Sequence, residues 1–214
     1  MKTNYLWAAG LAGLPFLIIL CLVATGNSAL LALDQAVNTA LYGGHYPLLV
    51  PIIRAFTYLG DNYLQLIFIA LLGIWLVYKR EKQLAIWLLL TNFLTISGIN
   101  QLVKFLIERP RPDLFDHLIL VGGYSFPSGH SMGSVVFYGS LALTLVYLWP
   151  RHFKHPALLY SLVSLLSLAL AWSRIFLGVH YFSDTLAGLS LGLACLILAK
   201  AAMDRWVDER PQVQ

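Results

Sequence analysis

Long runs of apolar residues, separated by short polar stretches, extend over most of the chain. A helix needs about 20 largely apolar residues to cross the hydrocarbon core of a membrane. Six runs approach that length, and the second extends at both ends beyond its apolar centre. The expected spans lie at about residues 5–25, 63–77, 84–107, 129–148, 157–172 and 181–202. The pattern therefore predicts an all-α, polytopic membrane protein built as a six-transmembrane-helix bundle.

The first apolar run follows Met1 and Lys2, so a secretory signal peptide is an alternative interpretation. Its apolar stretch is longer than the roughly 7–15 residues of a signal-peptide core. Small residues at 26–29 keep cleavage after the run as the alternative. We interpret the run as the first transmembrane helix.

Two interfacial helices are expected between the first two spans. Residues 28–42 place apolar side chains on one helical face and polar ones opposite or beside them, which is typical of a helix lying at the membrane surface. Prolines interrupt residues 46–59, which we interpret as a short, partly buried interfacial helix or, alternatively, as part of a spanning segment. The apolar set in 28–42 is Leu30, Leu33, Val37 and Leu41, and the polar set is Asp34, Gln35 and Asn38.

Composition supports this reading. Hydrophobic residues make up 59% of the 214 residues and charged residues only 11%, less than half the roughly 25% of an ordinary soluble domain. A soluble fold, a disordered chain, a coiled coil and a disulfide scaffold are all excluded. Cys21 and Cys195 lie inside apolar runs, so no disulfide is expected. Residues 1–214 are predicted to form a single integral membrane domain.

The distribution of basic residues predicts the orientation. With both termini in the cytoplasm, nine Lys and Arg residues fall inside and five outside, as the positive-inside rule requires. The net charge of +4 is therefore attributed to cytoplasmic loops and not to nucleic-acid binding. Four of the five outer cations cluster in two places, Lys104, Arg109 and Arg111 at 104–111 and Arg174 further on. These places belong to two of the three polar stretches that meet the outer face. Binding of an anion would explain cations placed against the rule.

The first of these stretches runs from Lys104 to Pro112. Lys104 and Arg111 would share a face if the helix continued, but the prolines at 110 and 112 are expected to end it and hold Arg111 in a stiff turn. An ammonium and a planar guanidinium together suit a phosphate. The alternative is a cluster of cations that snorkel to the interface.

The second stretch precedes the fourth span. Ser128 is expected to cap the helix and Gly129 to permit close approach to its backbone. Amide groups at a helix start favour an anion, and His130 would stand beside it. The alternative is an ordinary helix start.

The third stretch links the last two spans. His180 and Asp184 are four residues apart, so on a helix the carboxylate can hold one imidazole nitrogen and leave the other free to attack. Arg174 supplies another ligand for an anion. The alternatives are a buried structural pair and a zinc site that includes His130, although three nearby cations disfavour a metal dication.

Together the three stretches resemble the signature of the type 2 phosphatidic acid phosphatase family of lipid phosphatases. That signature consists of Lys-x6-Arg-Pro, Pro-Ser-Gly-His and Ser-Arg-x5-His-x3-Asp. Every defining position is matched, by Lys104 with Arg111-Pro112, by Pro127-Ser128-Gly129-His130, and by Ser173-Arg174 with His180 and Asp184. The signature spans residues 104–184, and the six-span arrangement extends the resemblance to nearly the whole chain.

The resemblance implies a six-helix core and a metal-independent phosphatase with no cofactor. It makes His180 the nucleophile, Asp184 its partner and His130 the general acid that protonates the leaving oxygen. It assigns the binding of phosphate oxygens to Lys104, Arg111, Arg174, Ser128 and the amide of Gly129. Arg109, Tyr124 and Ser125 lie nearby without an assigned role.

We therefore expect a multi-pass lipid phosphatase of a bacterial inner membrane, with its site at the periplasmic or outer face. The phosphate would enter between the third, fourth and sixth spans while the lipid chain stays in the bilayer. The resemblance suggests undecaprenyl pyrophosphate as the substrate, giving undecaprenyl phosphate. Phosphatidylglycerophosphate and phosphatidic acid are close rivals, followed by a lipid A phosphatase or a phosphotransferase.

Three other classes are disfavoured. Vanadium-dependent haloperoxidases share the anion site but are soluble. Glucose-6-phosphatase-like enzymes usually have more spans. A non-catalytic transporter of lipid phosphates would leave the paired histidines without a clear purpose. The sequence does not indicate an oligomeric state.

Overall fold

The computed structural model describes residues 2–207, and this part of the chain contains helices and no strands. Arg210, one of the cations expected on the cytoplasmic side, lies outside the described residues. The elements are α1 (Lys2–Ala24), α2 (Ser28–Leu41), η1 (Gly43–His45), α3 (Val50–Thr57), η2 (Tyr58–Gly60), α4 (Asn62–Tyr78), α5 (Lys82–Phe93), η3 (Leu94–Ile99), α6 (Asn100–Ile107), α7 (Gly129–Leu148), α8 (Ala157–Phe176) and α9 (Phe182–Trp206).

Within residues 2–207, five helices are long and apolar enough to cross a membrane. The sixth span is a bent pair, Val50–Gly60 with Asn62–Tyr78, whose parts meet at 43°. The all-α prediction is thus confirmed, with five or six spans. For the segment at 46–59, the sequence predicts either a short interfacial helix or part of a span. In the structure α3 is a separate short helix, and together with η2 it also continues α4 across the bend.

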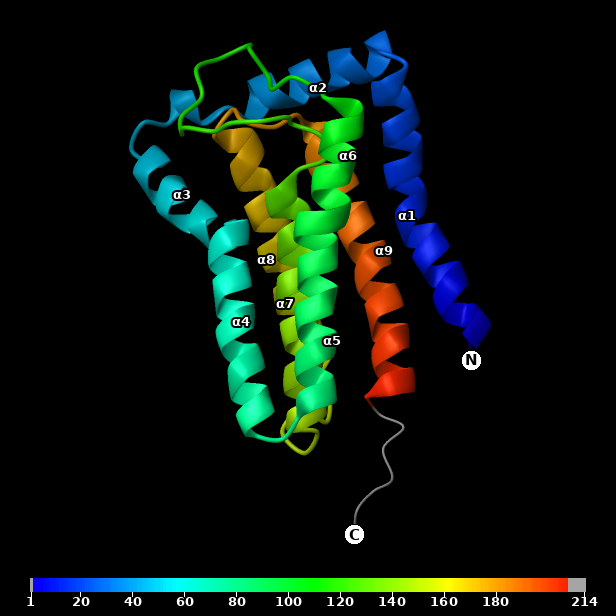
Figure 1. Ribbon diagram of the computed structural model, residues 1–214. Coiled ribbons are helices and arrows are strands. Elements are labelled where there is room, and N and C mark those ends of the chain that lie inside the picture. Colours follow the sequence, from blue (N-terminus) through cyan, green and yellow to red (C-terminus); the bar gives the residue numbers. More distant parts are fainter. Residues whose placement is uncertain (1, 208–214) are drawn as a thin grey trace.

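Figure 1 shows α4, α5, α7, α8 and α9 side by side, with α1 at the edge of the bundle and α2 lying across one end. Helix α1 begins, and α9 ends, at the opposite end of the bundle from α2. An even number of membrane crossings places the start and the end of the chain on the same side. The loop from 108 to 128 lies at the same end as α2, so the three polar stretches of the sequence gather there.

Close contact between α7 and α9 brings two of these stretches together. A Cβ atom on Gly188 would lie 2.6 Å from the carbonyl oxygen of Ser128, and one on Gly192 would lie 2.9 Å from that of Met132. Glycines four residues apart let helix backbones approach closely in membranes. The start of α7, which carries His130, is therefore held against the first turns of α9.

Helix α1 is bound to α9 at the position of Pro15, which lies inside the helix. A proline there removes one backbone hydrogen bond and displaces a carbonyl. The hydroxyl of Ser190 accepts a hydrogen bond from the Phe16 amide at 3.0 Å and donates one to the Ala12 carbonyl at 2.6 Å. Polar groups beside the proline are thereby satisfied away from water, as a membrane requires.

The third span differs from the simple helix expected at 84–107. It runs from Lys82 to Ile107 and contains the π-helical segment η3. Such wide turns are frequent at functional sites. Two of its polar residues face the protein: Asn92 is buried and donates to Ser140 Oγ at 2.9 Å, and Asn100 is buried beside α7.

Helix α2 turns its polar side toward the protein. An interfacial helix ordinarily presents that side to water, but Asp34 and Asn38 are fully or almost fully buried, while Leu31 and Leu33 are exposed. Helix α8 also continues to Phe176, one turn beyond the predicted end at 172, so Arg174 lies in its last turn. The burial of Asp34 and Asn38 follows from their hydrogen bonds to the turn before α9.

Candidate active site

A cavity of about 650 Å³ opens at the end of the bundle that carries α2 and the 108–128 loop. Its walls come from α4, α6, α7, α8 and the loops between them. Six of the eight predicted site residues line it: Lys104, Arg111, Gly129, His130, Arg174 and His180. The other two, Ser128 and Asp184, are fully buried. The three stretches of the sequence therefore meet at one site.

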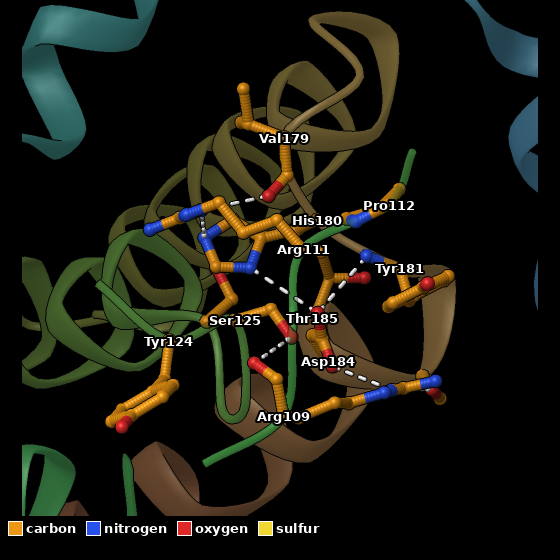
Figure 2. A network of polar contacts seen from close by, with 12 residues as sticks. Arg109, Arg111, Pro112, Tyr124, Ser125, Val179, His180, Tyr181, Asp184 and Thr185 are labelled. Carbon is orange, nitrogen blue, oxygen red and sulfur yellow. Dashed lines mark hydrogen bonds and ion pairs between the residues drawn. The ribbon is translucent and has the colours of Figure 1, made fainter. Parts of the chain in front are cut away.

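His180 lies between a carboxylate and a guanidinium, as Figure 2 shows. Its Nδ1 is 3.3 Å from Oδ2 of Asp184, and its Nε2 is 3.3 Å from Nη1 of Arg111. A guanidinium can only donate hydrogen bonds, so Nε2 presents its lone pair and Nδ1 carries the proton. This tautomer leaves Nε2 as the nucleophilic atom.

The surroundings of His180 keep its ring neutral. Only 3% of the side chain is exposed. Burial lowers the pKa of His180 well below its ordinary value, and the positive charges of Lys104, Arg111 and Arg174 lower it further. Both causes disfavour the charged imidazolium. The arrangement therefore supplies an imidazole that is free to attack without first losing a proton.

Asp184 is fixed from several directions. Its Oδ2 also accepts a hydrogen bond from the Tyr181 amide at 3.0 Å, which caps α9. Its other oxygen, Oδ1, accepts one from Nη1 of Arg109 at 2.7 Å. Figure 2 shows Arg109 reaching Asp184 from below in the view, with His180 above. The carboxylate that orients His180 is thus itself held in place.

Arg109 joins Asp184 to a second buried carboxylate that the sequence reasoning missed. Its Nη2 donates to Oδ2 of Asp34 at 2.7 Å, and its guanidinium lies 4.0 Å from the centre of the Tyr181 ring. Burial by itself lowers the pKa of Arg109, but Asp184 and Asp34 outweigh that effect and raise the pKa above its usual range. Arg109 is therefore firmly charged.

Two side chains of α2 hold the turn before α9. Asp34 accepts hydrogen bonds from the Ser183 amide at 2.8 Å and the Ser183 hydroxyl at 2.6 Å. Asn38 donates to the His180 carbonyl at 3.0 Å and accepts from the Phe182 amide at 3.1 Å. The only signal for this role in the sequence is the pair of polar residues, one turn apart, in a helix otherwise expected at a surface.

Backbone carbonyls hold two of the cations. Arg111 donates to the carbonyls of Gly122, Gly123 and Val179 at 2.8, 3.1 and 2.7 Å. Lys104 donates to the carbonyls of Tyr124 and Ser125 at 2.6 and 3.2 Å. These carbonyls carry no net charge, so they orient the two side chains without pairing either of them with a carboxylate.

Arg174 is 4% exposed and donates from Nη1 to Thr57 Oγ1 at 2.9 Å. Its Nε is buried without a hydrogen-bond partner in the described structure. A buried donor without a partner is costly. An anion bound in the cavity would supply the missing acceptor for Arg174 Nε.

The start of α7 presents the second histidine. Ser128 caps the helix, and its Oγ accepts hydrogen bonds from the Ser131 amide and hydroxyl at 3.4 and 3.0 Å. His130 lines the cavity, and within residues 2–207 its ring makes no hydrogen bond. A Cβ atom on Gly60 would lie 2.9 Å from the His130 ring. The histidine is thus positioned by packing, with its nitrogens open to a ligand.

The described residues do not assemble a metal site. Between residues 2 and 207, no three His, Cys, Asp or Glu side chains are grouped as metal ligands. The zinc alternative, with His180, Asp184 and His130 as ligands, is therefore not what the geometry favours.

Comparison with known proteins agrees with the signature. The profile of the PAP2 superfamily matches residues 84–208, which is more than half of the chain. The chain belongs to the PAP2 superfamily. It is 34% identical to phosphatidylglycerophosphatase B of Bacillus subtilis over 186 residues, covering 86% of this chain and 91% of the relative. It is 25% identical to an undecaprenyl-diphosphatase of Sulfolobus acidocaldarius, covering 59% and 58% of the two chains.

A solved structure matches the whole fold of this PAP2 protein. The crystal structure of the transmembrane PAP2 type phosphatidylglycerolphosphate phosphatase from Bacillus subtilis superimposes with a TM-score of 0.85 at 30% identity. The match covers 97% of this chain and all of that one. The PAP2 chain is a multi-span membrane lipid phosphatase, as the resemblance in the sequence implied.

Proposed function

We propose that this PAP2 phosphatase removes the terminal phosphate of a membrane lipid through a phosphohistidine on His180. The observation that carries the proposal is the orientation of the His180 ring, with Nδ1 toward Asp184 and Nε2 toward Arg111 and the cavity. Such an ordering of a base by a carboxylate is the logic of a catalytic triad. Residues 1–214 would act as one domain.

In the first step, His180 Nε2 attacks the phosphorus atom. The bond between phosphorus and the lipid oxygen breaks, and protonated His130 gives its proton to that oxygen. In the second step, a water molecule attacks the phosphohistidine while His130 takes a proton from it. The nitrogen–phosphorus bond then breaks and inorganic phosphate leaves. Two easier steps replace one difficult step.

The cations stabilise charge in both steps. Phosphoryl transfer spreads negative charge over three equatorial oxygens, and catalysis depends mainly on positioning and on neutralising that charge. Lys104, Arg111 and Arg174 line the cavity around His180. The Gly129 amide at the start of α7 adds a helix N-terminus. Ser128 takes part through the cap that fixes this turn.

Phosphatidylglycerophosphate is the substrate that the relatives favour. The Bacillus protein that matches nearly the whole chain is called a phosphatidylglycerolphosphate phosphatase. Undecaprenyl pyrophosphate, the substrate first suggested by the resemblance, is the second candidate because an undecaprenyl-diphosphatase is also similar. The cavity is bordered by Tyr63 of α4 and Phe105 of α6, both largely exposed, so it is open toward the outside of the bundle.

We infer that the site faces the periplasm or cell exterior of a bacterial inner membrane and that both termini are cytoplasmic. The turn after α4 carries Lys79, Arg80 and Lys82, and the turn after α7 carries Arg151 and Lys154. Both lie at the end of the bundle away from the cavity. The positive-inside rule supports a cytoplasmic location for that end.

Phosphate release by the purified protein in detergent tests the proposal. Phosphatidylglycerophosphate, undecaprenyl pyrophosphate and phosphatidic acid are compared in the presence of EDTA, beside His180→Ala. Release that survives EDTA and disappears in the variant supports a histidine mechanism without a metal. Loss of activity in EDTA, or full activity of the folded variant, would contradict it.

A further inference from the structure

A second cavity of about 560 Å³ adjoins the first at the outer end of the bundle. We call it the outer chamber. It lies between the α3–η2 segment and the loop at 117–121, and it shares Asp61, Val121, His130 and Arg174 with the first cavity. Its remaining lining residues include Arg54, Thr57, Tyr58 and His117.

The two histidines relate differently to the two cavities. His180 borders only the first cavity, whereas His130 borders both. Under the proposed function, His130 protonates the leaving oxygen, so the leaving group must lie on the His130 side of the phosphorus. The atoms next to that oxygen would therefore face the outer chamber.

Cationic groups border this chamber. Arg54, in the last turn of α3, is exposed and makes no hydrogen bond or ion pair with any residue between 2 and 207. The buried Nε of Arg174 has no partner in the described structure either. The lining carboxylate, Asp61, is engaged at the start of α4, where its Oδ1 accepts hydrogen bonds from the amides of Tyr63 and Leu64 at 3.0 Å. The free guanidinium of Arg54 suits a second anion, beside the Arg174 that the two cavities share.

We propose that the outer chamber is a subsite for a second phosphate, carried by the leaving group of the substrate, and that Arg54 binds it. This inference rests on the proposed function, because it uses the roles of His180 and His130. The ligand chemistry is a lipid phosphate whose leaving group bears another phosphate. A phosphodiester headgroup and a prenyl diphosphate both meet this description, whereas phosphatidic acid does not.

The Arg54 subsite predicts selectivity between one and two phosphates. The substrates are phosphatidylglycerophosphate, a prenyl diphosphate and phosphatidic acid, with the acyl chains matched in the two glycerolipids. Arg54→Gln is expected to raise KM for both two-phosphate lipids about tenfold, which is the loss of one charge-assisted contact. The KM for phosphatidic acid should stay within about twofold. Arg54→Lys should recover part of the loss.

The controls separate this proposal from the proposed function. Arg151→Gln removes an exposed cation at the other end of the bundle and should leave all three KM values unchanged. Equal losses on one-phosphate and two-phosphate lipids, or no loss on any, would overturn the subsite. A rise in KM for only one of the two-phosphate lipids would show that Arg54 does not recognise the second phosphate that both lipids carry. Failure of the wild-type protein to release phosphate, or full activity of His180→Ala, would instead overturn the proposed function.

Discussion

Arg109 Nη1 lies 2.7 Å from Oδ1 of Asp184, while the other oxygen of the same carboxylate faces His180. Arg109 also pairs with buried Asp34, so one guanidinium connects α2 to the carboxylate beside the proposed nucleophile. We expect Arg109 to position Asp184, because its described contacts are with protein groups.

Replacing Arg109 with Gln is expected to lower kcat more than it raises KM. Asp184 would lose the partner that fixes its second oxygen, and His180 would lose its orientation. Misplacement of a catalytic group by about 1 Å can cost about a hundredfold in rate, so we expect a loss of roughly tenfold to a hundredfold in kcat. Steady-state kinetics on phosphatidylglycerophosphate measures it.

Asp34→Asn offers the matched test of this connection. Arg109 keeps Asp184 as a partner, so kcat should fall less than in Arg109→Gln. Adding Asp34→Asn to Arg109→Gln should cost less in kcat than Asp34→Asn costs in the wild type, because part of the effect of Asp34 passes through Arg109. Losses that simply multiply in the double variant would show that Asp34 and Arg109 act separately.

His130 is expected to matter most when the leaving group is poor. General acid catalysis contributes about a hundredfold to ten-thousandfold, and His130→Ala should lose that much on a lipid phosphate. With an aryl phosphate such as p-nitrophenyl phosphate, the leaving p-nitrophenolate departs without taking up a proton. The same variant should therefore form the phosphoenzyme from this substrate at much of the wild-type rate. Comparing the burst phases for the two substrates measures the difference. Equal losses on both would remove His130 from the role of acid.

The lowered pKa of His180 predicts the acid side of the pH profile. An ordinary histidine titrates near pH 6.5, and burial together with Lys104, Arg111 and Arg174 moves the pKa of His180 well below that. His180 should remain neutral and active down through pH 6.5. We expect a bell-shaped pH–rate profile in which the acid limb of kcat/KM lies below that pH. The basic limb is expected in kcat, where it reports loss of the proton from His130 in the substrate complex, because the negative phosphate favours the protonated ring there.

The free energy of unfolding should also depend on pH, because His180 binds its proton less readily in the folded chain than in the unfolded chain. Below about pH 6.5 the unfolded chain takes up a proton that folded His180 resists, so the free energy of unfolding decreases as the pH falls. A His180→Gln variant should lose less stability between pH 7 and 5 than the wild type. An acid limb of kcat/KM at or above pH 6.5 would mean that the site does not hold His180 neutral.

Gly188 is expected to control the distance between α7 and α9. A Cβ atom there would lie 2.6 Å from the Ser128 carbonyl and 3.0 Å from Ser131 Cβ. Backbone atoms cannot rotate away, so Gly188→Ala should separate the helices and destabilise the protein by about 1–3 kcal/mol. Activity should fall as well, because His130 and His180 belong to the two helix starts. Thermal unfolding in detergent and phosphate release measure these effects.

Gly10→Ala is the control for this change. A Cβ atom on Gly10 has nothing within 4 Å, and alanine favours a helix over glycine by about 1 kcal/mol. It should therefore leave activity unchanged and stability unchanged or slightly higher. Wild-type activity in Gly188→Ala would show that the spacing of α7 and α9 is less constrained than the close contact at Gly188 indicates.

Spacing relates the local parts of the site, and the family resemblance groups its three stretches, but neither predicts the contacts that α2 makes. His180 and Asp184 are one helical turn apart, and Lys104 and Arg111 lie within a single polar stretch, so spacing alone relates them. Asp34 reaches Ser183 across 149 positions of sequence, and no local pattern predicts such a contact. The polar side of α2 was therefore visible in the sequence, but its burial depends on the packing of α2 against α9.

The same distinction explains the differences in the helices. The apolar pattern predicts where spans lie, because length and hydropathy set that requirement. It does not predict that η3 widens into a π-helical segment, or that α8 continues for another turn to carry Arg174. The outer chamber likewise joins Arg54 of α3 to residues of the 117–121 loop, which only the folded chain brings together.

Trapping the phosphoenzyme tests directly whether His180 is the nucleophile. Wild-type protein is mixed with a lipid substrate labelled in its terminal phosphate and quenched within the first turnover, and the labelled peptide is identified by mass spectrometry. We expect label on His180, stable in alkali and lost in acid, and no label in folded His180→Ala. Label on another residue, or turnover by His180→Ala at the wild-type rate, would contradict it.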